Sequence, residues 1–142
     1  MNLIIKYDRN FMAISDRIEA DRHRHWLLQL FLSSQKDLNI EVNDQRILCS
    51  AILVNINTIH MFQAKGEPNF TMLVDPTSEL GRRFKEILID QPFYVFPEHI
   101  IKDMQQAFNH ALAKDRKDDY LSFARSTISF FSNWPMKCFD DR

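Results

Sequence analysis

Glycine and cysteine are both scarce in this sequence of 142 residues, which contains two of each. Gly-rich phosphate-binding loops need several glycines within a short segment, so Walker and Rossmann nucleotide sites are excluded. The two cysteines, Cys49 and Cys138, lie far apart and form no metal-binding or disulfide motif, which indicates a reducing compartment. Because the N-terminus has no secretory signal pattern, we expect a cytoplasmic location.

Neither sign of charge dominates, and long apolar runs are missing. Eighteen Lys and Arg side chains stand against nineteen Asp and Glu, which leaves a net charge of −1. Domains that bind nucleic acid through the phosphate backbone need an excess of positive charge, so we expect no DNA binding by this chain alone. No run approaches the roughly 18 apolar residues that span a bilayer, so we expect no membrane association. The length and the 45% hydrophobic content indicate one globular domain.

Short segments rich in β-forming residues fill the first half of the sequence. Polar turn signals such as Asn43-Asp44-Gln45 separate them. Short strands at this spacing favour a β-sandwich or a barrel that closes its edges. The expected strands are 3–5, 11–14, 26–32, 38–42, 47–54, 59–63 and 70–74.

The hydrophobic period changes from strand to helix near residue 75. Asp75-Pro76-Thr77-Ser78 is a helix-start signal, and apolar residues then recur at helical spacing. Longer helices are expected from Pro97 to about Ala113 and from Asp118 or Asp119 to Pro135. We therefore predict a β-barrel over 1–75, a helical extension of the same domain over 76–134, and the start of a linker or tail over 135–142.

Three histidines form the clearest chemical pattern. His23 and His25 are two residues apart at the entry to the expected strand 26–32, so we expect them to share a face with Gln29. His60 lies on a later strand, and if both faces line one barrel, three imidazoles converge on its interior. The candidates for a small-molecule effector pocket on these faces are His23, His25, Gln29, Phe31, His60 and Phe62.

Several interpretations of these side chains stay open. Neutral imidazole suits Fe, Zn, Ni or Cu, so His23, His25 and His60 are candidate metal ligands. The same histidines could line a polar pocket without a metal, or could simply hydrogen-bond their neighbours. Phe31 and Phe62 have a second interpretation as core, because side chains fill the interior of small barrels.

The histidine spacing resembles the cupin superfamily. In cupins, His-x-His is followed three or four residues later by Glu, and a second motif adds one further His. Here the corresponding residues are His23-Arg24-His25, Gln29 in the place of the Glu, and His60. The glycines of both cupin motifs are missing, with Arg17 and Lys36 near their expected places. The resemblance implies a cupin-like double-stranded β-helix, that is, a jelly-roll barrel.

The chain as a whole resembles the N-terminal sensor domain of AraC-type transcriptional regulators. Three segments carry this resemblance: 23–30 (HRHWLLQL), 56–60 (INTIH) and 72–84 (MLVDPTSELGRRF). In that family the strand before the "DPxS" turn leads out of the cupin barrel, and helices follow, the last of which commonly dimerises. The resemblance implies an effector-sensing and dimerisation domain with a small molecule in the barrel. The family's helix-turn-helix part is absent from these 142 residues, so DNA would be bound only through a further domain.

The expected last helix has an apolar stripe with two interpretations. Amphipathic helices usually cover the core of their own chain. The three-four-three spacing also suits a self-complementary seam between two copies, and the AraC resemblance favours that function. The candidates for a homodimer interface are Leu121, Ala124, Ile128, Phe131 and Trp134.

Two other functions compete with the regulator domain. One is a small metal-dependent cupin enzyme, a dioxygenase or isomerase, in which His23, His25 and His60 hold Fe, Mn, Ni or Zn and Gln29 is an optional fourth ligand. No separate general acid or base stands out in the sequence, so no catalytic residue is assigned. The other is a cupin-like module that sequesters a small molecule without regulating DNA.

Overall fold

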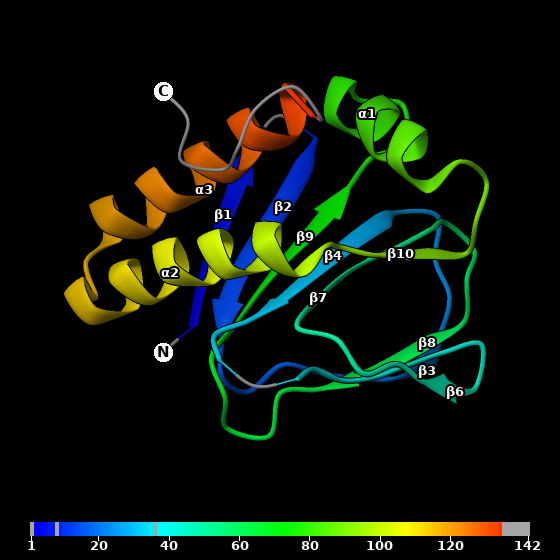
Figure 1. Cartoon of the computed structure of the whole chain (residues 1–142), viewed down its shortest axis with the longest axis horizontal. Coiled ribbons are helices and arrows are strands. Elements are labelled where there is room, and N and C mark those ends of the chain that lie inside the picture. The colour runs from blue at the N-terminus through cyan, green and yellow to red at the C-terminus, as the bar shows by residue number, and fades with distance from the viewer. Residues whose placement is uncertain (1, 8, 36, 135–142) are drawn as a thin grey trace.

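The chain folds into two antiparallel β-sheets and three helices, as seen in a computed structural model that describes residues 2–7, 9–35 and 37–134 (Figure 1). The six-stranded sheet has the order β1-β2-β9-β4-β7-β10, and the four-stranded sheet has the order β3-β8-β5-β6. The strands are β1 (Asn2–Tyr7), β2 (Asn10–Ser15), β3 (Glu19–His23), β4 (Leu28–Ser33), β5 (Asn39–Val42), β6 (Gln45–Arg46), β7 (Ala51–Val54), β8 (His60–Gln63), β9 (Asn69–Val74) and β10 (Phe93–Val95). The helices are α1 (Glu79–Leu88), α2 (Glu98–Lys114) and α3 (Lys117–Ser132).

The six-stranded sheet is covered differently on its two faces. The helices lie over one face, with α1 and α3 near the top of Figure 1 and α2 at mid-height, and the larger apolar core lies between the helices and the sheet. Phe70 of β9 meets Phe123 of α3 there at a ring-centroid distance of 4.9 Å. The four-stranded sheet faces the other side, and a second core lies between the sheets, where the rings of Phe31 and Phe62 are 4.8 Å apart.

Strand alternation explains how one sheet serves two cores. In β4, Leu28, Leu30 and Leu32 belong to the helix-side core, while Phe31 between them belongs to the core between the sheets. In β7, Leu53 and Ile52 divide in the same way. Because neighbouring side chains of a strand point to opposite faces, both strands are buried along their whole length and lack the alternation of a half-exposed strand.

The structure confirms the predicted mainly β class with helices that follow it. It is compatible with the cupin-like fold, but the strands of the described residues form two separate sheets and no closed barrel. Three strands of the described residues, β3, β6 and β10, were missed from the sequence. The segment 93–95, expected as a connector, pairs with β7 at the edge of the six-stranded sheet, and β3 lies in a segment with few β-formers. The predicted linker or tail, 135–142, lies outside the described residues.

The segment after β9 is built to start a helix. Ser78 is the N-cap of α1, and its Oγ accepts a hydrogen bond of 3.0 Å from the backbone N–H of Gly81. Asp75 Oδ1 accepts from the backbone N–H and the hydroxyl of Thr77. Asn10 Oδ1 in β2 accepts from the backbone N–H of Asp75, which ties this turn to the sheet. The "DPTSELG" segment of the AraC resemblance therefore has a structural function here.

Candidate functional site

A cluster of three histidines and one glutamine lies between the two sheets. His23 at the end of β3 is the register partner of His60 in β8, and both belong to the four-stranded sheet. Gln29 comes from β4 of the other sheet, and His25 lies in the connection between β3 and β4. The ring centroid of His23 is 4.4 Å from that of His60 and 5.2 Å from that of His25. One ring nitrogen of each histidine lies within 4.8 Å of the others.

The histidines converge as expected, but by a different path of the chain. The expectation that His23, His25 and Gln29 share one face of one strand is wrong, because β3 ends at His23 and β4 begins at Leu28. The chain crosses from one sheet to the other between these two positions. His23 and Gln29 therefore approach each other from opposite sheets, and their proximity comes from sheet stacking.

Gln29 is held by a short chain of hydrogen bonds behind the cluster. Its residue is 7% exposed, and its Nε2 donates to Thr71 Oγ1 in β9 over 3.1 Å. The Thr71 hydroxyl in turn donates to the backbone carbonyl of Leu30 over 2.9 Å. Since the hydroxyl has one proton and gives it to Leu30, it accepts from Gln29. This assigns the amide oxygen of Gln29 to the side that faces the histidines.

The backbone partners of the rings assign their tautomers. The N–H of Leu27 donates to His25 Nδ1 over 3.2 Å, so the neutral His25 ring carries its proton on Nε2 and donates it to Gln29 Oε1 over 3.0 Å. His60 Nδ1 lies 2.8 Å from the carbonyl of Thr58 and must donate to it. His60 Nε2 is then an acceptor, although it lies 3.1 Å from Gln29 Oε1. By the same reasoning His23 donates from Nδ1 to the carbonyl of Asp21 over 2.6 Å, which leaves its Nε2 as an acceptor.

The electrostatic surroundings keep His60 neutral. The residue is 2% exposed, and burial lowers the pKa of its imidazole to about 4. The hydrogen bond to the Thr58 carbonyl works against this shift, and the nearby His23 and His25 rings add to it. A neutral His60 and an oriented Gln29 therefore present acceptors to the centre of the cluster.

The two phenylalanines among the pocket candidates are fully buried in the core between the sheets. Phe31 packs on Phe62, and its ring centroid lies 6.1 Å from that of His60. The pair therefore closes the apolar side of the cluster. The polar candidates and the apolar candidates are neighbours in space, as the sequence analysis expected, but the phenylalanines serve first as core.

The donor set could hold a divalent metal ion, with differences among the three rings. Ligating histidines usually donate their second ring N–H to a carbonyl or a carboxylate, and His23 and His60 both do so. His25 differs, because its Nδ1 accepts the N–H of Leu27 and its proton is on Nε2. Gln29 supplies an amide oxygen in the place where cupins have a carboxylate, which is a weaker ligand for a cation. His23, His25 and His60 would hold the ion, and Gln29 would be the added oxygen donor.

Part of the six-stranded sheet beside the cluster is left uncovered. Gln29 pairs across the ladder with Leu73 of β9, and Leu73 pairs with Phe11 of β2. Two residues further along β2, Ala13 pairs with Ile4 of β1. These side chains point away from the helices, and we call Ile4, Phe11, Ala13 and Leu73 the uncovered strip. Ile4 is 75% exposed and Phe11 is 44% exposed. No pattern in the sequence predicted this surface, although Phe11 alternates with Met12, which faces the helices.

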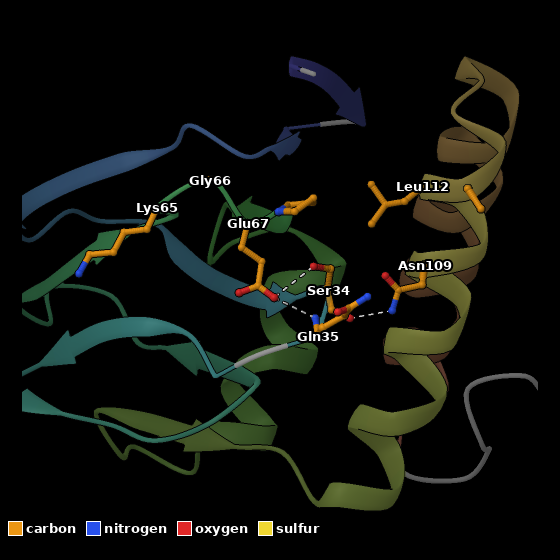
Figure 2. Close-up of a pocket in the computed structure, with 9 residues that line it drawn as sticks. Ser34, Gln35, Lys65, Gly66, Glu67, Asn109 and Leu112 are labelled. Atoms are coloured by element: carbon orange, nitrogen blue, oxygen red, sulfur yellow. Dashed lines mark hydrogen bonds between the residues drawn. The ribbon is translucent and has the colours of Figure 1, made fainter.

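A separate cleft of about 540 Å³ lies between the turn before β9 and the helix α2 (Figure 2). Asn109 of α2 donates to the carbonyl of Ser34, and Glu67 accepts from the hydroxyl of Ser34 and the N–H of Gln35. Its lining shares no residue with the histidine cluster. No pattern in the sequence pointed to this cleft, because its walls come from three distant segments.

The candidates for a dimer interface are divided by the structure. Ala124 and Phe131 are buried in the core of their own chain, under the six-stranded sheet. Leu121, Ile128 and Trp134 are partly exposed. A contact between two copies through α3 would therefore involve the second group. In the described residues, no helix is both long and apolar enough to cross a membrane.

Comparisons with known proteins find similarity in structure only. No family model matches the sequence, and no curated protein matches it. A protein from Neisseria meningitidis, NMB1881, is similar over 53% of this chain and 84% of its own, with 11% identity and a TM-score of 0.41. A conserved protein of unknown function from Streptococcus pyogenes, SPY1581, is similar over 55% and 75%, with 9% identity and a TM-score of 0.45.

A third solved structure is that of a candidate mannose-6-phosphate isomerase from Ralstonia eutropha. The similarity covers 53% of this chain and 83% of that protein, with 11% identity and a TM-score of 0.40. All three similarities are partial, so they transfer no activity. The function has to be inferred from the side chains of this chain.

Proposed function

We propose that this chain is the effector-sensing and dimerisation domain of an AraC-type transcriptional regulator, with a cupin-like fold. The observation that carries the proposal is the cluster of His23, His25, Gln29 and His60 beside the apolar core that lies between the two sheets. Buried polar groups with convergent positions in an apolar setting are typical of small-molecule sites. Cytoplasmic location and homodimer formation belong to the same proposal.

The fold offers a short physical connection between the cluster and the helices. Gln29 and Thr71 face the cluster, and their strand neighbours Leu28, Leu30 and Met72 face the helix-side core. A ligand that moves Gln29 would therefore move side chains that pack under the helices, one residue away along the strand. Coupling of this kind requires that the ligand binds one arrangement of the helices better than the other.

A fusion assay tests the regulator function. The chain is joined to a DNA-binding domain that represses a reporter only as a dimer, and a small-molecule library is screened for compounds that change repression. We expect repression by the fusion, and a response to some compound that Gln29→Leu abolishes while repression persists. A fusion that does not repress would overturn dimerisation. A response unaffected by Gln29→Leu would overturn the assignment of the pocket.

The histidine group favours a second candidate, a small metal-dependent cupin enzyme. A metal held by His23, His25 and His60 would supply Lewis-acid chemistry to a bound substrate. The test is elemental mass spectrometry on untagged protein after incubation with Fe, Mn, Ni and Zn, with His60→Ala alongside. A near-stoichiometric ion that the variant loses would make the enzyme, or a metal-dependent sensor, the leading function.

A further inference from the structure

The cluster has more hydrogen-bond acceptors than donors. Gln29 Oε1, His60 Nε2 and His23 Nε2 are acceptors in the neutral state, and the one ring donor among them, His25 Nε2–H, is used by Gln29. Within the described residues no second donor reaches His60 Nε2. Two lone pairs that face each other at 3.1 Å are unfavourable, and a buried acceptor without a donor destabilises the fold. The cluster is therefore complementary to a ligand that brings a donor.

The width of the cluster suits a hydrogen-bonding group. Three ring nitrogens separated from one another by 4.8 Å all lie about 2.8 Å from the point at their centre. That separation is a hydrogen-bond distance. Bonds from histidine nitrogen to zinc are roughly 2.0–2.1 Å, so a metal would require the rings to move inward. A hydroxyl oxygen at that point would lie at hydrogen-bond distance from the ring nitrogens without such movement.

The absence of a carboxylate from the cluster favours a neutral hydroxyl over an ammonium group as the ligand's donor. The cluster of titratable side chains in the described part of the chain contains histidines and no carboxylate. An ammonium group brought there would lose its hydration without an opposite charge in return, which is costly. A neutral hydroxyl brings a donor without that cost.

The uncovered strip offers apolar contact to the part of the ligand that carries no donor. It continues from Gln29 through Leu73 to Phe11 in consecutive pairs of the ladder, each one strand spacing further from the cluster. An exposed phenylalanine beside a part-exposed leucine offers apolar contact to a ring or a short chain. The acceptors that lack a donor and the uncovered strip therefore lie side by side on one face of the six-stranded sheet.

We propose that the site takes a small neutral ligand with a hydroxyl group at one end and an apolar body at the other. The hydroxyl shares its one proton between His60 Nε2 and Gln29 Oε1 in a three-centre hydrogen bond, and the apolar body lies on Leu73 and Phe11. This proposal rests on the proposed function in one respect, namely that the histidine cluster is the ligand site.

The test compares four probes that share a methyl-substituted ring. They are 4-methylphenol, its donor-free methyl ether 4-methylanisole, the cation 4-methylbenzylamine and the anion 4-methylbenzoate. Binding is followed in chelator-treated protein by NMR of ¹⁵N-labelled histidine rings, in which an accepted hydrogen bond changes the Nε2 resonance of His60. We expect 4-methylphenol to bind at least about fivefold more tightly than 4-methylanisole, because only the phenol supplies the missing donor.

Two variants locate the two ends of the probe. Gln29→Leu removes an acceptor and should reduce the preference for the phenol over its ether. Phe11→Ser should weaken both probes by a similar factor, whereas Tyr7→Ser, at an exposed aromatic residue on β1 that is 49% exposed, should weaken neither.

Several results would overturn the ligand class. They are equal binding of phenol and ether, tighter binding of the amine or the benzoate, and no binding of any probe at 10 mM. These outcomes differ from a failure of the regulator function, because the fusion assay reports repression independently of these probes. Selective phenol binding beside a fusion that does not repress would retain the ligand class and reject the regulator.

Discussion

The Nε2 atom of His60 lies 3.1 Å from the amide oxygen of Gln29, and in the neutral cluster neither atom carries a hydrogen. The orientation of each side chain is held by a different partner, His60 by the Thr58 carbonyl and Gln29 by the Thr71 hydroxyl. Neither can turn to relieve the contact without losing another hydrogen bond. A proton, a metal ion or a ligand hydroxyl between the two atoms would relieve it.

Acidification should destabilise the fold through His60. In the unfolded chain this imidazole has a pKa near 6.5, whereas burial lowers it to about 4 in the fold, so between these values the unfolded chain binds more protons. The contribution is constant above pH 6.5, and stability falls progressively down to about pH 4, by on the order of 3 kcal/mol in total. Urea unfolding of chelator-treated protein at pH 7, 5.5 and 4.5 measures this loss. In His60→Leu the same pH steps should cost markedly less, and an equal loss in the variant would show that other groups are responsible.

Gln29→Glu should strengthen divalent metal binding. The substitution places a carboxylate beside three imidazoles and supplies the ligand type that Gln29 lacks. We expect at least about a tenfold lower Kd for Ni²⁺ or Zn²⁺, measured by calorimetry at pH 7.5. Gln106→Glu on the exposed side of α2 adds the same charge away from the cluster and should change nothing. Equal affinities of the two variants would remove Gln29 from the metal-binding set.

Gly81→Ala should cost more stability than Gly66→Ala. A Cβ at Gly81 would lie 2.1 Å from the backbone oxygen of Asp75, so the first turn of α1 would have to move. We expect a loss of about 2–3 kcal/mol, in the range of overpacked sites. Gly66 has φ +82° and open space around it, so its alanine variant should lose only about 1 kcal/mol to backbone strain. Chemical denaturation of both variants gives the order, and the reverse order would contradict the close approach of Gly81.

Ile89→Asn should stabilise the protein. Ile89 is the C-cap of α1 at φ 48° and is 74% exposed, so a β-branched side chain adopts the left-handed region while burying little. Asparagine tolerates this conformation, and we expect a gain of about 0.5–1 kcal/mol in the free energy of unfolding. Ile4→Asn is the matched control, because Ile4 is equally exposed on a strand, and it should show no gain. A destabilised Ile89→Asn variant would indicate that the isoleucine makes a contact that offsets its strain.

Much of the local structure was predictable because local patterns cause it. The polar run at Asp75 and Ser78 predicted the start of α1, and the structure confirms a helix whose N-cap is Ser78. Pro97 was expected to open a longer helix, and α2 follows it directly. The start of each of these helices depends on side chains within about one helical turn of its first residue. The strand β10 was not predictable in this way, since three residues at a sheet edge leave no period to detect.

At the histidine cluster, local patterns predicted the residue types but not how the chain brings them together. The types of residue at His23, His25 and His60 already indicated a polar centre, and the structure brings their ring nitrogens within 4.8 Å. The expected reason for their proximity, a shared face of one strand, was wrong. Strand periodicity holds only inside one strand, and β3 and β4 belong to different sheets.

The sequence by itself determined the mainly β class of the fold, the helices after residue 75 and the types of residue at the cluster, because these follow from composition and short-range spacing. Only the tertiary structure decided that Gln29 faces His60 from the opposite sheet, that Thr71 orients its amide, and that Phe11 and Leu73 stay uncovered beside it. Those features depend on the register and stacking of strands that are distant in sequence. Such long-range contacts are set by the packing of the whole core, and no local pattern encodes them.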